Sequence, residues 1–128
     1  LRGVDKAYRE RTGQKPMTTF ETKEYYDYLK ENSADFDKDL RRIRDNKKTH
    51  FTMMTDQIKM SSIYSYKGWE ADNVILLIQP AKEYIQAEDS IMAMPELVYT
   101  AITRARNNLF VINLGNVSFD NFFKNISY

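Results

Sequence analysis

The sequence contains no cysteine, four glycines and three prolines. The absence of cysteine excludes disulfides and thiolate metal sites, and it favours an intracellular, here cytoplasmic, location. The longest uninterrupted apolar run, Val74–Ile78, is far too short to span a bilayer, so no membrane partner is expected. No signal-peptide pattern is evident. Because the chain opens at Leu1 and not at a methionine, we expect a fragment of a longer protein.

Neither basic nor acidic residues are in clear excess. With 19 basic and 18 acidic residues, the formal net charge of +1 does not signal a nucleic-acid partner, although a local basic patch can still exist. A length of 128 residues allows one domain with a core adequate for independent folding. We expect a single domain over residues 1–128, with a helical part at 1–50 and a strand-rich core at 51–128.

The first 50 residues predict a short strand and two helices. Residues 1–16 give no clear pattern, and Met17–Phe20 fits a short strand. Thr22 suits the N-cap of a helix that runs to about Lys30. A second helix fits residues 35–47, where apolar residues recur at helical spacing.

The second predicted helix is basic toward its end. One interpretation is a nucleic-acid patch, and the other is that bases simply favour the negative end of a helix. The bases are Arg41, Arg42, Arg44, Lys47 and Lys48.

The rest of the chain predicts strands and helices in alternation. A helix from Pro95 to about Arg106 and a closing helix near residues 119–126 are expected, with a loop at 81–94. Two of the strands lack polar alternation, as strands buried on both faces do. The order of elements predicts a three-layer α/β domain with a largely parallel sheet. The expected strands are Phe51–Met54, Ile58–Ile63, Val74–Ile78 and Leu109–Leu114.

Chemistry is expected where loops leave the carboxyl ends of such strands. Gly68 there would permit a tight turn and close approach to a ligand, beside the cation Lys67 and the acceptor Glu70. The alternative is a turn without a site. Arg104 is a second candidate on its predicted helix, although angular position does not separate it from Arg106.

Two segments together carry a family resemblance. The stretch "SSIYSYKGWEADNVILLI" resembles motif V of the UvrD/Rep-like superfamily 1 helicases, which reads roughly T-h-H-S-x-K-G-L-E before a hydrophobic strand. The stretch "ELVYTAITRARNNLFVIN" resembles their motif VI, roughly L-x-Y-V-A-x-T-R-A-R before a strand. Their order and spacing are compatible with the family, and together they cover about a third of the chain. The resemblance implies the C-terminal (second) RecA-like motor domain of a DNA or RNA helicase.

The resemblance implies roles for the residues that match. Arg104 would reach the γ-phosphate of ATP as an arginine finger, and Thr103 would orient it. Glu70 would contact the nucleotide at its ribose, while Gly68 and Lys67 would link that site to the nucleic-acid path.

The matching residues of motif V imply a second contact, to the backbone of a single-stranded DNA or RNA. They are Ser62, Tyr64 and Ser65. Tyr64 stands where the family has histidine, Trp69 where it has leucine, and Ala71 where it has an aromatic residue. A tyrosine can still stack on a base or bind a phosphate.

No G-x-x-x-x-G-K-[ST] phosphate loop is present, since Gly3, Gly13, Gly68 and Gly115 cannot supply one. ATP with Mg²⁺ would therefore be held mainly by an absent N-terminal RecA-like domain, and this chain alone would not hydrolyse it. The alternatives are a RecA-like binding or regulatory module without a working motor, and an unrelated α/β domain that matches by chance.

Overall fold

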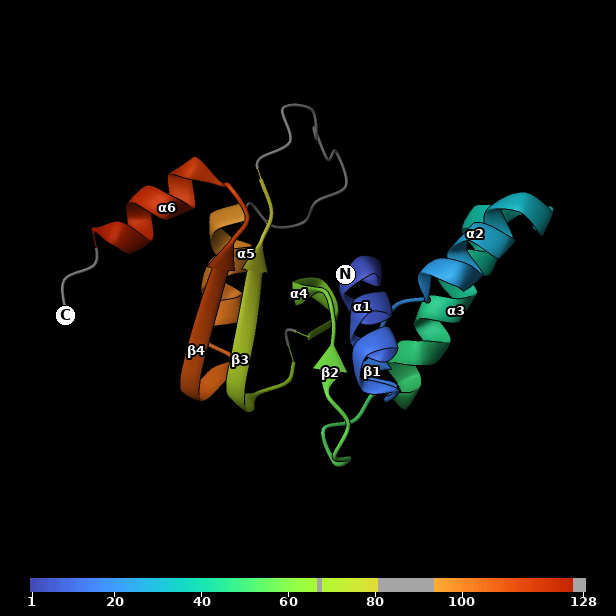
Figure 1. Cartoon of the computed structure of the whole chain (residues 1–128), viewed down its shortest axis with the longest axis horizontal. Helices are drawn as coiled ribbons and strands as arrows, with labels where there is room; N and C mark the ends of the chain where they lie inside the picture. Colours follow the sequence, from blue (N-terminus) through green and yellow to red (C-terminus); the bar gives the residue numbers. More distant parts are fainter. Residues whose placement is uncertain (67, 81–93, 126–128) are drawn as a thin grey trace. The chain divides into compact units, whose positions relative to one another are not determined.

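The computed structural model describes residues 1–66, 68–80 and 94–125 (Figure 1). The chain forms two compact units, which are called here unit 1 (Leu1–Gly68) and unit 2 (Trp69–Tyr128), and each is described by itself. The boundary between them falls later than the predicted change of character at residue 50. The single domain over residues 1–128 stays a prediction.

Unit 1 begins with a helix that the apolar pattern did not reveal. Helix α1 spans Arg2–Thr12, and Gly13 ends it in the left-handed region at φ 69°. The amide of Gly13 donates to the carbonyl of Arg9 (2.9 Å). Charged pairs four residues apart, such as Lys6 with Glu10 (2.7 Å), support this helix in place of a broad apolar stripe.

The two predicted helices of unit 1 are confirmed, with slightly different ends. Helix α2 spans Lys23–Asn32, and the Thr22 hydroxyl accepts from the amide of Tyr25 (3.2 Å). Helix α3 spans Phe36–His50 and ends three residues later than expected. Both helices therefore begin at residues whose side chains satisfy an otherwise unpartnered helical amide. The cap of α3 is Asp35, whose carboxylate accepts from the amide of Lys38 (3.2 Å).

The strands of unit 1 are shorter than predicted. Strand β1 (Met17–Thr18) pairs in parallel with β2 (Lys59–Met60), and the four-residue helix α4 (Ile63–Tyr66) follows. The strand predicted at Phe51–Met54 is wrong. Its first residue is a buried core side chain whose ring meets that of Tyr66 edge-on at 6.4 Å. Met54 is 92% exposed, so this apolar run lies on no common face.

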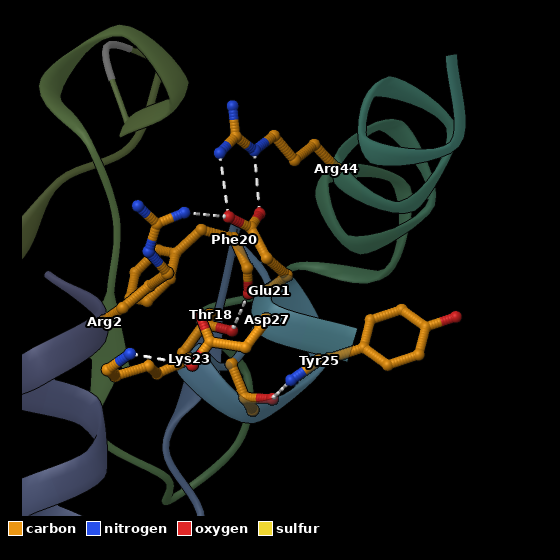
Figure 2. A network of polar contacts seen from close by, with 9 residues as sticks. Arg2, Thr18, Phe20, Glu21, Lys23, Tyr25, Asp27 and Arg44 are labelled. Carbon is orange, nitrogen blue, oxygen red and sulfur yellow. Dashed lines mark hydrogen bonds and ion pairs between the residues drawn. The ribbon is translucent and has the colours of Figure 1, made fainter. Parts of the chain in front are cut away.

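Charged side chains lie inside unit 1. Glu21 is 1% exposed and accepts hydrogen bonds from two guanidinium groups, as Figure 2 shows. Arg44 donates through Nε and Nη2 (both 2.8 Å), and Arg2 donates through Nη1 (2.7 Å). Arg2 also stacks on the ring of Tyr26 at 3.7 Å. Glu21 thus connects α1 to α3 through one carboxylate.

Unit 2 is built on one pair of parallel strands. Strand β3 spans Ala71–Ile78, and β4 spans Ala105–Asn113. Helix α5 (Met94–Ile102) contacts β4, and helix α6 (Val117–Lys124) follows the strand (Figure 1). Both strand pairs found among the described residues are parallel, so the predicted α/β class with parallel pairing agrees with the fold. Residues 81–93 of the expected loop lie outside the described residues.

Burial on both faces, predicted for β3 and β4, is wrong for the described part of unit 2. Leu76 and Ile78 are buried (5% and 3% exposed), whereas Ile75 is 65% exposed. On β4, Phe110 is 57% exposed and Ile112 46%. Because side chains alternate along a strand, an all-apolar strand still has two different faces. One face forms the core, and the other remains apolar and exposed.

Candidate functional site

Glu70 and Arg104 lie next to each other at one end of unit 2. Each immediately precedes a strand, and the first residues of those strands, Ala71 and Ala105, are register partners. The amide of Ala71 donates to the carbonyl of Arg104 (3.0 Å). Because the strands are parallel, these two residues share the amino end of the pair. Glu70 was predicted in the loop that leaves the preceding strand, and in the structure it lies at the end of that connection, directly before β3.

The helix expected to carry Arg104 ends before reaching it. Helix α5 stops at Ile102, and β4 begins at Ala105, so Arg104 lies in the turn between them. The amide of Arg104 bonds to the carbonyl of Ala101 (3.1 Å), a tighter spacing than that of the α-helix. The helical spacing of apolar residues continued to Ala105, but parallel pairing with β3 takes that residue into the strand.

Thr103 lies beside Arg104, as its predicted orienting role requires. Its hydroxyl donates to the carbonyl of Thr100 (2.8 Å) and accepts from Arg104 Nη2 (3.3 Å). This contact fixes one nitrogen of the guanidinium against the end of α5. Arg104 is half-buried, so its side chain lies against unit 2 and does not extend fully into solvent.

The arginine that contacts Glu70 is Arg106. Its Nε lies 3.4 Å from Glu70 Oε2, and its Nη1 lies 4.0 Å from Asp72 Oδ1. All three side chains are about half exposed or more. Sequence analysis named Arg106 only as an alternative to Arg104, and the two arginines have different surroundings in the structure.

The predicted nucleic-acid residues lie at the carboxyl end of β2 in unit 1. The Ser62 carbonyl accepts from the amides of Ser65 and Tyr66 (both 3.1 Å), and its hydroxyl donates to Ser65 Oγ (3.2 Å). Ser62 and Ser65 therefore form a hydroxyl pair around the start of α4. Tyr64 is 42% exposed on the same short helix.

The glycine turn itself is only partly described. Lys67 lies outside the described residues. Gly68 is exposed, and its backbone does not use the left-handed region, in contrast to Gly13 and Gly115. Gly68 lies in a turn, in agreement with the prediction that it would permit one. Close approach of a ligand to Gly68 stays a prediction.

A second pair of hydroxyls near β2 was missed in the sequence analysis. Thr19 follows β1, and its Oγ1 lies 2.8 Å from Ser61 Oγ, across the parallel pair. The signal was available, since a polar residue directly follows each strand and parallel strands bring such residues together. Lys47 Nζ also donates to Thr18 Oγ1 (3.3 Å), so a cation of α3 reaches this end of the strands.

The groups gathered in unit 2 suit anions and hydroxyls better than metals. A guanidinium can bind phosphate oxygens, and a carboxylate can accept from ribose hydroxyls. Within residues 1–66, 68–80 and 94–125, no group of three or more histidine or acidic side chains could hold a metal ion.

Two further features of the described residues were examined for signs of a membrane span or a ligand pocket. In the described part of the chain, no helix combines the length and the apolar character needed to cross a bilayer. A shallow hollow on α1, lined by Val4, Ala7 and Tyr8 among others, includes none of the predicted site residues.

Comparisons of this chain with protein-family models, with curated proteins and with solved structures found no match.

Proposed function

We propose that this chain is the C-terminal RecA-like motor domain of an ATP-dependent DNA or RNA helicase or translocase of the UvrD/Rep-like superfamily 1. The proposal includes a complete three-layer domain in which further elements cover the exposed face of β3 and β4. It rests first on the ordered pair of motif-like segments, residues 61–78 and 96–113.

One structural observation supports the proposal most directly. The glutamate of the first segment and the arginine of the second are 34 residues apart in sequence (104 − 70), yet the backbone bond from Ala71 to Arg104 makes them neighbours. A site shared by a ribose and a γ-phosphate needs a carboxylate and a guanidinium within reach of one nucleotide. Glu70 and Arg104 meet that requirement at the level of the backbone.

In the proposed mechanism this chain contributes half of an ATP site. Arg104, oriented by Thr103, stabilises negative charge that develops on the γ-phosphate, and Glu70 accepts from the ribose. Mg²⁺, held with the phosphates by an N-terminal RecA-like domain, would neutralise charge on the nucleotide. Ser62, Tyr64, Ser65 and Lys67 contact the single strand.

The test is an Arg104→Ala substitution in the full-length protein. We expect nucleic-acid-stimulated hydrolysis to fall by about a thousandfold or more, as loss of an arginine finger does, while ATP binding is retained. Arg11→Ala, at an exposed arginine of α1, is the matched control and should leave turnover unchanged. An unchanged turnover number for Arg104→Ala would remove that residue from its role.

A second candidate function is a RecA-like binding or regulatory module without a motor. The observation that favours it is Tyr64, which stands where the helicase motif has histidine. Such a module would bind a single strand but would show no stimulated hydrolysis in the full-length protein.

Robust ATP hydrolysis by the 128-residue chain alone would contradict the proposed half-site.

A further inference from the structure

The ion-pair cluster at the amino end of β3 and β4 has an arginine at its centre. Arg106 contacts Glu70 (3.4 Å) and lies 4.0 Å from Asp72. Residues two apart on a strand face the same side, so one guanidinium serves two carboxylates on one face. With exposed fractions of 60%, 49% and 63% for the three side chains, the pairs contribute little to stability.

An irregularity in the strand pairing occurs at Arg106. Ala71 pairs with Ala105, but Asn73 pairs with Asn108, so β4 uses one more residue than β3 over this stretch. The extra residue falls at positions 106–107, which is a bulge, and bulges change the direction of a side chain. Beyond the bulge, Asn108 Nδ2 donates to Asn73 Oδ1 (2.8 Å) across the strands and marks the return to regular pairing.

The contact leaves Glu70 able to bind a ligand. The nearest approach of Arg106 is to Oε2, and an ionised carboxylate has acceptor positions on both oxygens. Glu70 can therefore accept from the guanidinium and from a hydroxyl of a ligand at the same time.

We propose that Arg106 is a positioning residue that holds Glu70 toward the 2′-hydroxyl of the ribose of a nucleoside triphosphate. The inference rests on the proposed function, and it assigns the two arginines separate tasks. Arg104 acts at the phosphates, whereas Arg106 acts through Glu70 on the choice between a ribonucleotide and a deoxyribonucleotide.

The experiment measures kcat and KM of the full-length protein for ATP and for 2′-deoxy-ATP. We expect Glu70→Gln to raise the KM for ATP about tenfold, the size of one lost hydrogen bond to a charged group, with little effect on 2′-deoxy-ATP. Arg106→Gln should weaken the preference for ATP in the same direction but about threefold, because the carboxylate remains and is only less well held. Neither substitution should change kcat by more than about twofold, since a ground-state contact acts on KM.

Two further variants separate positioning from folding. Arg106→Lys keeps a cation near Glu70 and should restore part of the preference for ATP. Arg11→Gln removes an exposed arginine from α1 and should leave both substrates unaffected.

The outcomes are distinguishable. If Glu70→Gln loses the preference for ATP and Arg106→Gln keeps it, the role of Arg106 is overturned while the proposed function stands. If Glu70→Gln also keeps the preference, the ribose contact is overturned and the role of Arg106 with it. A wild-type protein that neither binds nor hydrolyses ATP would overturn the proposed function as well.

Discussion

The interior of unit 1 and the interior of unit 2 are stabilised by different interactions. In unit 1, the two most completely buried side chains are the carboxylates Glu21 and Asp5, at 1% and 2% exposure. Asp5 accepts from Arg9 (3.1 Å), which also bonds to Glu24 (2.9 Å). In the described part of unit 2, by contrast, no charged side chain is buried. Its core consists of Leu76, Ile78, Val98 and Ala101.

The difference separates two ways of fixing a fold. Apolar burial stabilises in proportion to area but tolerates changes of shape, whereas a buried carboxylate is stable only with its partners in place. Glu21 requires guanidinium groups from both α1 and α3, so it specifies how these helices are arranged. The core of unit 2 provides stability through the packing of α5 on β4, without such a requirement.

The largest expected effect is that of Glu21→Gln in the 128-residue chain. Because the substitution leaves Arg2 and Arg44 without their buried partner, we expect the amides of unit 1 to lose about 3 kcal/mol of protection. Hydrogen exchange followed by mass spectrometry measures each unit separately.

The matched control is Glu24→Gln, whose carboxylate is 53% exposed and pairs with Arg9 at the surface. We expect a loss below about 1 kcal/mol there. Equal losses for the two variants would show that burial of the charge is not what distinguishes unit 1.

The next effect compares the two faces of β3. Leu76→Ala removes a buried side chain and should cost unit 2 about 3 kcal/mol, measured by hydrogen exchange of the β3 and β4 amides. Ile75→Ala, one residue earlier on the exposed face, should cost less than about 1 kcal/mol. A similar loss for both variants in the 128-residue chain would contradict the exposure of Ile75.

The success of the sequence-based predictions also differed between the two units. In unit 2, apolar runs identified both strands, because a strand in a core must be apolar whatever its neighbours are. The faces were wrong, since a run such as Val74–Ile78 does not say how many layers cover it. In unit 1, the N-caps Thr22 and Asp35 were predictable from local chemistry, but the partners of Glu21 come from positions 19 and 23 residues away.

The candidate site was predictable to a similar extent. Motif-like segments identified Glu70 and Arg104, and their backbones do lie side by side. The contact of Arg106 with Glu70 depends on a one-residue bulge in β4, and no periodic pattern contains that information. The hydroxyl pair of Thr19 and Ser61 was missed for a different reason, because it depends on the pairing of β1 with β2.

The smallest effect in the comparison is that of pH. Burial opposes the charged form of Glu21, but hydrogen bonds from Arg44, from the backbone and from Arg2 outweigh it and hold the pKa of Glu21 below its ordinary value of 4.5. A group whose pKa is lower in the folded state stabilises fully above its unfolded pKa, and that stability is lost as pH falls through the folded pKa.

Unit 1 should therefore keep its full protection at pH 6 and begin to lose it below about pH 4.5, because the unfolded carboxylate takes up protons first. Glu24 adds to the same trend, since its own backbone amide and Arg9 lower its pKa. Hydrogen exchange between pH 6 and pH 4, corrected for intrinsic rates, measures the slope for unit 1. In Glu21→Gln the slope should be smaller than in the unsubstituted chain, because the variant lacks the group that titrates. An unchanged slope would mean that other carboxylates dominate the acid response. The buried charge would then determine the arrangement of the helices without making unit 1 the more acid-sensitive part of the chain.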